Sequence, residues 1–209
     1  MRRVYVLMAS LLGAFFFLSL NIGSSGQTLW ELNGFLENPI LDLRLTRTLS
    51  AFFVGGSLAL SGLYLQTLLR NPLAEPYTLG LSGGASLGAV LAASLGAGFL
   101  ASSFSAVLGC WLIAILILWI AQKEQMGETK TIILFGVMIS FLCGAIVSLM
   151  TSLLDSTQLF SVYSWLIGQV GTSLDTYWYF AAVAALIGLL WGLINKKTLD
   201  LLLIDAQIA

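Results

Sequence analysis

The chain has 209 residues, of which 58% are hydrophobic and only 9% are charged, and its formal net charge is −1. Soluble domains carry about 25% charged residues, so this composition excludes a soluble globular protein and indicates a membrane protein. The nearly neutral charge also gives no sign of nucleic-acid binding.

Six apolar runs are long enough to be read as membrane-spanning helices, because a helix of about 20 apolar residues crosses a bilayer. They lack the alternation at every second residue that marks a membrane β-barrel. We therefore predict an all-α, polytopic transmembrane helical bundle, forming a single membrane-embedded domain over residues 1–209. The six predicted spans cover residues 4–22, 49–69, 84–100, 104–121, 131–154 and 177–194.

The first run follows Arg2 and Arg3, as the apolar core of a signal peptide would. No clean small-x-small cleavage site comes after it, because residues 23–26 (Gly-Ser-Ser-Gly) match that pattern only weakly. We therefore expect a retained helix.

The positions of lysine and arginine predict the topology, since these residues accumulate in cytoplasmic loops. A cytoplasmic N-terminus places seven of the nine basic residues on the inner side, and it makes the last residue cytoplasmic as well. Only Arg44 and Arg47 then lie outside, which calls for a functional reason. The inner seven are Arg2, Arg3, Arg70, Lys123, Lys130, Lys196 and Lys197.

Two longer connections fall on the outer side. Residues 23–46 are expected to include a short interfacial helix. Residues 155–176 are expected to form a second outer segment, in which Tyr163 and Trp165 suit the level of the lipid headgroups.

Small residues recur at four-residue spacing in the third and fifth runs. Such residues let helices approach closely in lipid, so helix packing is the favoured interpretation, and the lining of a translocation path is the alternative. The positions are Gly80, Gly84 and Gly88, and then Gly136, Ser140, Gly144 and Ser148.

The sequence offers little for catalysis. It contains no histidine, and Cys110 and Cys143 lie in separate runs, where packing roles are expected. The P-loop pattern is also missing, so any ATP hydrolysis must come from a partner. We expect neither an enzyme nor a bound cofactor or metal.

The second run is followed by residues 71–76 (Asn-Pro-Leu-Ala-Glu-Pro). Proline removes a helical donor and restricts the residue before it, so the second helix should end near Arg70. The segment is either a simple loop or a gate that faces the cytoplasm.

These residues together resemble the permease subunits of bacterial inner-membrane ABC importers for iron-siderophores, haem and vitamin B12. That family shares an Arg-Leu-Pro-Arg motif, a glycine-rich second helix, Asn-Pro-Leu-Ala and Leu-Gly-x-Ser-x-Gly-Ala. The resemblance runs from about Arg44 to the last residue. The matching positions are Arg44–Arg47, Gly55-Gly56, Ser61-Gly62, Gln66, Asn71–Ala74, Leu79–Ala85, Gly136, Trp165-Leu166, Gly168 and Leu199–Leu202.

The resemblance implies an importer that works with several partners. These are a second permease copy or paralogue, cytoplasmic ATP-binding subunits, an extracytoplasmic substrate-binding protein and membrane lipid. The implied cargo is an iron(III)-siderophore-type chelate, with cobalamin or haem as the alternative.

The resemblance also assigns roles to individual residues. Arg44 and Arg47 would dock acidic residues of the binding protein, although anchoring of the helix to headgroups is a second interpretation. The other implied residues are Gln66, Asn71, Pro72, Leu79 and Thr129 for the translocation path or gate, and Leu201, Leu202 and Asp205 for ATPase coupling.

The chain departs from the family pattern at Thr46, where proline is usual, and at Asp205, where glycine is usual. The family has about ten helices, whereas six are predicted here and the sequence ends within the coupling segment. We therefore expect the N-terminal two-thirds of a permease, with a non-transporting remnant as an alternative.

Overall fold

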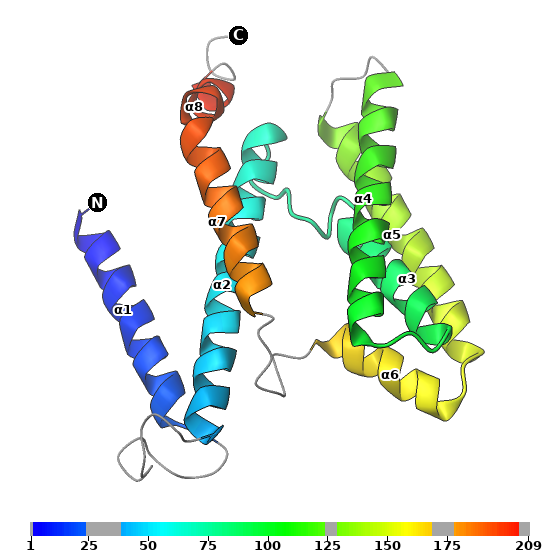
Figure 1. The fold of residues 1–209 in the computed structure, drawn as a ribbon. Helices are drawn as coiled ribbons and strands as arrows, with labels where there is room; N and C mark the ends of the chain where they lie inside the picture. Colours follow the sequence, from blue (N-terminus) through cyan, green and yellow to red (C-terminus); the bar gives the residue numbers. More distant parts are fainter. Residues whose placement is uncertain (1, 24–38, 124–128, 169–177, 205–209) are drawn as a thin grey trace. The chain divides into compact units, whose positions relative to one another are not determined.

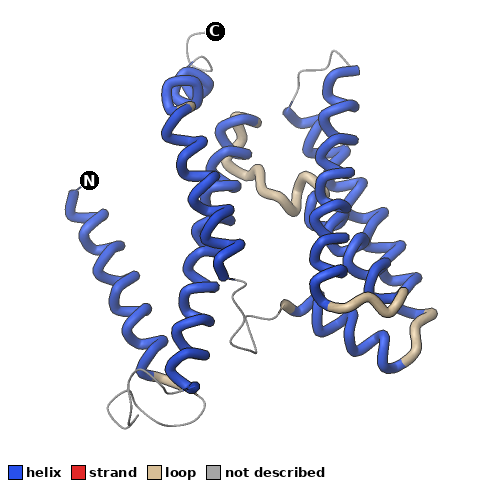
Figure 2. The backbone as a smooth tube through the Cα atoms, viewed as in Figure 1, coloured by secondary structure: helices blue, strands red, loops and turns tan. Residues whose placement is uncertain are grey.

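The computed structural model describes residues 2–23, 39–123, 129–168 and 178–204. All regular secondary structure in these ranges is α-helical, with the connections drawn as loops in Figure 2. The predicted all-α fold class is therefore confirmed. The helices in Figure 1 are α1 (Arg2–Asn21), α2 (Pro39–Leu68), α3 (Leu81–Ser94), α4 (Phe99–Lys123), α5 (Thr129–Ser152), α6 (Ser156–Ile167), α7 (Trp178–Ile194) and α8 (Lys196–Ile204).

Within the described residues, four helices are long and apolar enough to cross a membrane: α1, α2, α4 and α5. A fifth crossing is possible if α7 and α8, which are bent by 71° relative to each other, count as one broken span. Helix α3 has only 14 residues. The predicted number of six spans is therefore not confirmed.

The third predicted span, residues 84–100, has the wrong bounds. Helix α3 ends at Ser94, because Gly96 adopts a left-handed φ of 76°. The N–H groups of Gly96 and Ala97 then bond to Ala93 O and Ala92 O at 3.0 Å each. A glycine in this conformation is a common helix C-terminus, so the apolar run is divided between α3 and α4.

The structure adds helices to the two predicted outer segments. Residues 156–167 of the second one form helix α6, which starts with a capping box between Asp155 and Gln158. In the first one, α2 already begins at Pro39, ten residues before the predicted span at 49–69, so Arg44 and Arg47 lie inside this helix. The predicted interfacial helix falls largely on residues 24–38, which lie outside the described ranges.

The chain divides into two compact units, each described by itself. The first comprises Met1–Leu58 and Val170–Leu190, and the second comprises Ala59–Gln169 and Trp191–Ala209. In the first unit, Ser57 Oγ of α2 donates to Ala181 O of α7 at 3.4 Å, and the Phe53 and Trp178 rings stack at 5.9 Å.

The second unit is built around α3, which packs against α4, α5 and α6. Figure 1 shows α6 running across the ends of the other three helices. Gln158 Nε2 of α6 donates to Ser94 O of α3 at 3.1 Å, and Trp165 Nε1 donates to Ser103 Oγ of α4 at 3.4 Å.

Glycines allow α3 to approach its neighbours at backbone distance. A Cβ on Gly84 would lie 2.6 Å from Gly109 O of α4, and a Cβ on Gly80 would lie 2.7 Å from Gly136 O of α5. A Cβ on Gly88 would overlap the carbonyl of Ser105. These contacts favour the packing interpretation of the small residues, although Gly144 has nothing within 4 Å.

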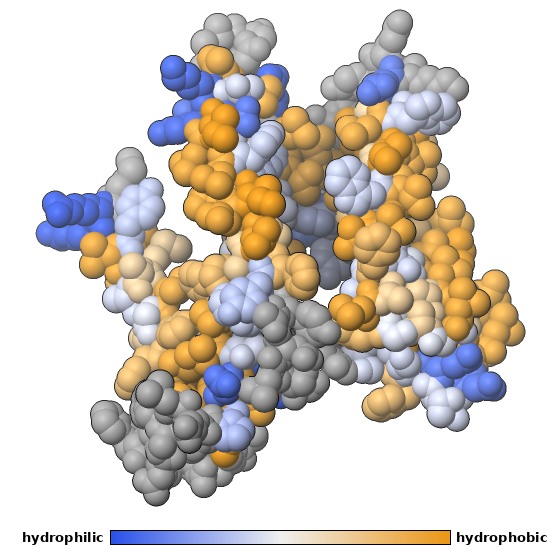
Figure 3. Space-filling model, in the orientation of Figure 1, coloured by the Kyte–Doolittle hydropathy of each residue, from blue (hydrophilic) through white to orange (hydrophobic). Residues whose placement is uncertain are grey.

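Hydrophobic residues cover the sides of the helices, as Figure 3 shows in orange. Large side chains such as Phe15, Phe141 and Phe180 are more than two-thirds exposed. An apolar exterior of this kind suits contact with lipid. Blue, hydrophilic residues gather at the start of α1, which carries Arg2 and Arg3, and at α8, which carries Lys196 and Lys197.

Candidate functional site

The two arginines of the Arg-Leu-Thr-Arg sequence lie in the first three turns of α2 but have different surroundings. Arg44 is buried, with 8% of its surface exposed. Its Nη1 atom donates to Leu20 O at 2.9 Å and to Asn21 O at 3.4 Å, both at the end of α1. Arg47, by contrast, is exposed.

A second polar contact joins the same two helices. Thr48 Oγ1 donates to Arg44 O at 2.7 Å and lies 2.8 Å from Ser19 Oγ of α1. A hydroxyl has a single hydrogen, and that of Thr48 is used on the carbonyl, so Ser19 is the donor between the two hydroxyls. We call the set Ser19, Leu20, Gly23, Arg44 and Thr48 the α1–α2 joint.

Gly23 completes the joint. A Cβ at this position would lie 2.6 Å from Nε and 2.7 Å from Cζ of Arg44. A side chain at this position would therefore displace the guanidinium from its place beside the end of α1.

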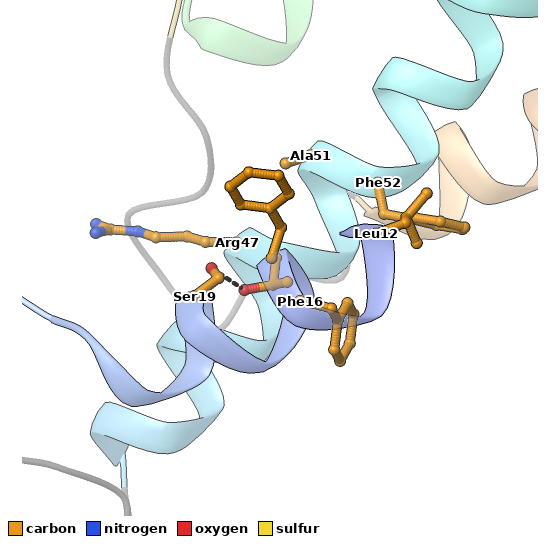
Figure 4. Close-up of a pocket in the computed structure, with 8 residues that line it drawn as sticks. Leu12, Phe16, Ser19, Arg47, Ala51 and Phe52 are labelled. Carbon is orange, nitrogen blue, oxygen red and sulfur yellow. Dashed lines mark hydrogen bonds between the residues drawn. The ribbon is translucent and has the colours of Figure 1, made fainter. Parts of the chain in front are cut away.

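A cavity of about 440 Å³ opens beside the joint, between α1 and α2. Its walls are mainly apolar, and Figure 4 shows the Ser19–Thr48 hydrogen bond at one end. In the same view the Arg47 side chain extends away from the aromatic residues. The lining residues are Leu12, Phe15, Phe16, Ser19, Arg47, Thr48, Ala51 and Phe52.

The residues after α2 form an ordered turn in the second unit. Helix α2 ends at Leu68, close to the predicted end at Arg70, and Arg70 has a positive φ of 48°. Asn71 Oδ1 accepts a hydrogen bond from Leu73 N at 2.9 Å. The Thr78 hydroxyl bonds to both the N–H and the carbonyl of Glu75, at 3.1 and 2.8 Å.

The residues implied for the path or gate have unlike environments. Leu79 is buried in a cluster with Leu69, Ala74 and Ile117, and Ala74 has no exposed surface. Gln66 and Pro72 are exposed, whereas Asn71 is half-buried. Thr129 is the first residue of α5. The structure thus places Asn71, Pro72 and Leu79 in one turn, next to the end of the helix that holds Gln66.

The implied coupling segment forms helix α8, directly after the bend at Asn195. Leu201 is 65% exposed and Leu202 is half-buried. Asp205 lies outside the described residues. In the part of the chain that the structure describes, no group of three or more Cys, Asp or Glu side chains is placed to hold a metal ion.

Sequence reasoning missed the partners of Arg44. Ser19 and Thr48 are small polar residues near the ends of apolar runs, a pattern that often marks contacts between helices in lipid. Gly23 is also a recognisable signal, since it follows the first run directly.

Comparison with known proteins gives a consistent result. The model of the FecCD transport family matches residues 6–209. The chain is also similar over its full length to a solved structure described as an inward-facing ABC transporter of the metal-chelate type. That match has a TM-score of 0.80, is 29% identical in sequence and covers 67% of the other chain.

Three curated relatives have different substrates in their names. The vitamin B12 import permease BtuC of Vibrio parahaemolyticus is 34% identical over 83% of this chain and 53% of its own length. The hemin permease HmuU of Yersinia pestis is 32% identical over 88% of this chain and 58% of its own length. The molybdate permease MolB of Haemophilus influenzae is 33% identical over 74% of this chain and 48% of its own length. The chain thus spans about half the length of the curated relatives that it matches.

Proposed function

The chain belongs to the FecCD transport family, and from this premise we propose that it acts as a membrane-spanning permease subunit of an ABC importer. Its apolar helices and the permease relatives support a multi-pass protein of the inner membrane. We further propose that it works with a second permease copy or paralogue, with cytoplasmic ATP-binding subunits and with an extracytoplasmic binding protein.

The proposed cargo is an iron(III)-siderophore-type chelate. The structural neighbour of the metal-chelate type supports this class of cargo. The relatives named for vitamin B12 and hemin support the alternative, cobalamin or haem, equally well. All three cargoes hold their metal within an organic ligand, which agrees with a chain that contains no histidine.

We propose that the start of α2, with Arg44 and Arg47, is the docking site for the binding protein. The exposed Arg47 carries this proposal, because the charge bias places it on the outer side, where Arg44 is the only other basic residue. Arginine pairs well with carboxylates, and charge complementarity steers association. The ordered turn at Asn71–Leu79 and helix α8 are proposed as the cytoplasmic gate region and the ATPase contact.

The test is capture of the binding protein encoded with the permease, measured on the full chain in nanodiscs at low salt. Exposed ion pairs contribute roughly 0.2–1 kcal/mol, so Arg47→Glu should weaken capture several-fold through lost attraction and added repulsion. Arg70→Glu is the matched control, since the charge bias places Arg70 on the opposite side. Equal capture by Arg47→Glu and the unaltered chain would remove this end of α2 from the docking site.

Cargo is tested by uptake into cells that depend on this permease. Labelled iron(III)-siderophore should accumulate, and unlabelled cobalamin or hemin should not compete with it. If cobalamin or hemin competes with the siderophore, the alternative cargo, cobalamin or haem, is favoured.

A further inference from the structure

We propose that the two arginines of α2 have separate roles: Arg44 fastens the end of α1 to α2, and Arg47 makes the contact with the binding protein. The proposal rests on the docking function proposed above and divides that function between a positioning residue and a contact residue.

The surroundings of Arg44 suit an internal role. Its guanidinium is buried and donates to the carbonyls of Leu20 and Asn21. These are the last two carbonyls of α1, which have no partner within their own helix. The positive charge also lies at the negative end of the helix dipole of α1. With only 8% of its surface exposed, Arg44 offers little contact area to a carboxylate of another protein.

Gly23 supports the same conclusion from the other side of the contact. Any side chain there would push the guanidinium away from the end of α1, because its Cβ would lie within 2.7 Å of Arg44 Cζ. Gly13, in the middle of α1, has nothing within 4 Å. The same substitution at the two glycines therefore separates the joint from a general effect on the helix.

Arg47 lies one turn further along α2 and is oriented differently. It is exposed, and although it lines the cavity between α1 and α2, Figure 4 shows its side chain extending away from the aromatic residues there. The Ser19–Thr48 contact and the Thr48 bond to Arg44 O hold the same turn of the helix. The joint thereby fixes the backbone from which Arg47 projects.

The first measurement is hydrogen–deuterium exchange of the full chain in nanodiscs without any partner. Arg44→Gln and Gly23→Ala should each speed exchange in the last turn of α1, including the Ile22 amide, which bonds to Leu18 O at 2.8 Å. We expect an increase of about tenfold or more, the ratio that corresponds to the loss of one hydrogen bond from a charged group. Arg44→Lys should give a smaller increase, whereas Gly13→Ala and Arg47→Gln should give none. Unchanged exchange in both Arg44→Gln and Gly23→Ala would overturn the proposal.

The second measurement is capture of the binding protein at several salt concentrations. Arg47→Gln should reduce the dependence of capture on salt, because it removes a screened charge contact. Arg44→Gln should leave that dependence unchanged, even if capture itself becomes weaker. A reduced salt dependence in Arg44→Gln would show that Arg44 is a contact residue and refute the division of roles. Unaltered capture by Arg47→Gln would refute docking by Arg47, while the exchange data would still decide the role of Arg44.

Discussion

The crossing of α3 and α4 gives the sharpest prediction for stability. At Gly84 the two backbones are so close that a Cβ would lie 2.6 Å from Gly109 O, whereas ordinary contact begins at 3.4 Å. The same Cβ would overlap Ile113 Cγ1. In Gly84→Ala the helices must therefore separate by nearly an ångström, or the backbone of α4 must shift.

Overpacking of this kind typically costs about 1–3 kcal/mol. For a chain of this size each kcal/mol lowers Tm by about 2–4 °C, so Gly84→Ala should lower Tm by roughly 2–12 °C. Gly144→Ala is the matched control, because Gly144 lies in α5 with nothing within 4 Å. That change should be neutral or slightly stabilising, since alanine favours the helix by up to about 1 kcal/mol over glycine.

The natural cysteines provide the assay. Cys143 is 4% exposed, and Cys110 is half-buried in α4. A thiol-reactive dye should therefore report on the loss of packing in this unit during heating. If Gly84→Ala melts at the same temperature as Gly144→Ala, the close approach of α3 and α4 is not a source of stability.

Two further predictions concern the topology and helix α6. The topology is tested in a chain that lacks Cys110 and Cys143. Ile22→Cys should react with an impermeant maleimide added outside, whereas Leu201→Cys should react only after the membrane is opened. The reverse pattern would refute the predicted orientation. Gln158→Ala removes the bonds to Ser94 O and Asp155 N, at 3.1 and 3.4 Å. This change should lower the stability by about 1–2 kcal/mol in the same thermal assay. Thr157→Ala, at an exposed residue of the same helix, should leave the stability unchanged. Equal melting temperatures for the two variants would contradict the proposed role of Gln158.

Local sequence signals predicted some elements well. The Asn71-Pro72 pair predicts the end of α2 to within two residues, because proline acts on its immediate neighbours. The Asp155–Gln158 capping box, which starts α6, was also present in the sequence and was missed. Likewise, the pair Gly96 and Gly98 could have shown that residues 84–100 are not one helix.

Other features depend on contacts between distant parts of the chain. The partners of Arg44 are backbone carbonyls 23 and 24 residues earlier, and no residue type marks a carbonyl as an acceptor. The charge pattern singled out Arg44 and Arg47 together, since both break the positive-inside bias. It could not distinguish the buried one from the exposed one, which depends on where α1 ends.

The shortness of α3 has a consequence for how the chain enters the membrane. Fourteen residues make a helix of about 21 Å, whereas the hydrocarbon core is about 30 Å thick. The residues before it, from Glu75 to Gly80, continue as hydrogen-bonded turns, with Leu79 N bonding to Glu75 O at 3.3 Å and Leu81 N bonding to Pro76 O at 3.1 Å. Backbone that lies within the hydrocarbon core without a full helix must be shielded by protein, and the glycine contacts bring α4 and α5 close enough to α3 for that purpose. Membrane insertion of this segment therefore depends on helices that are synthesised after it.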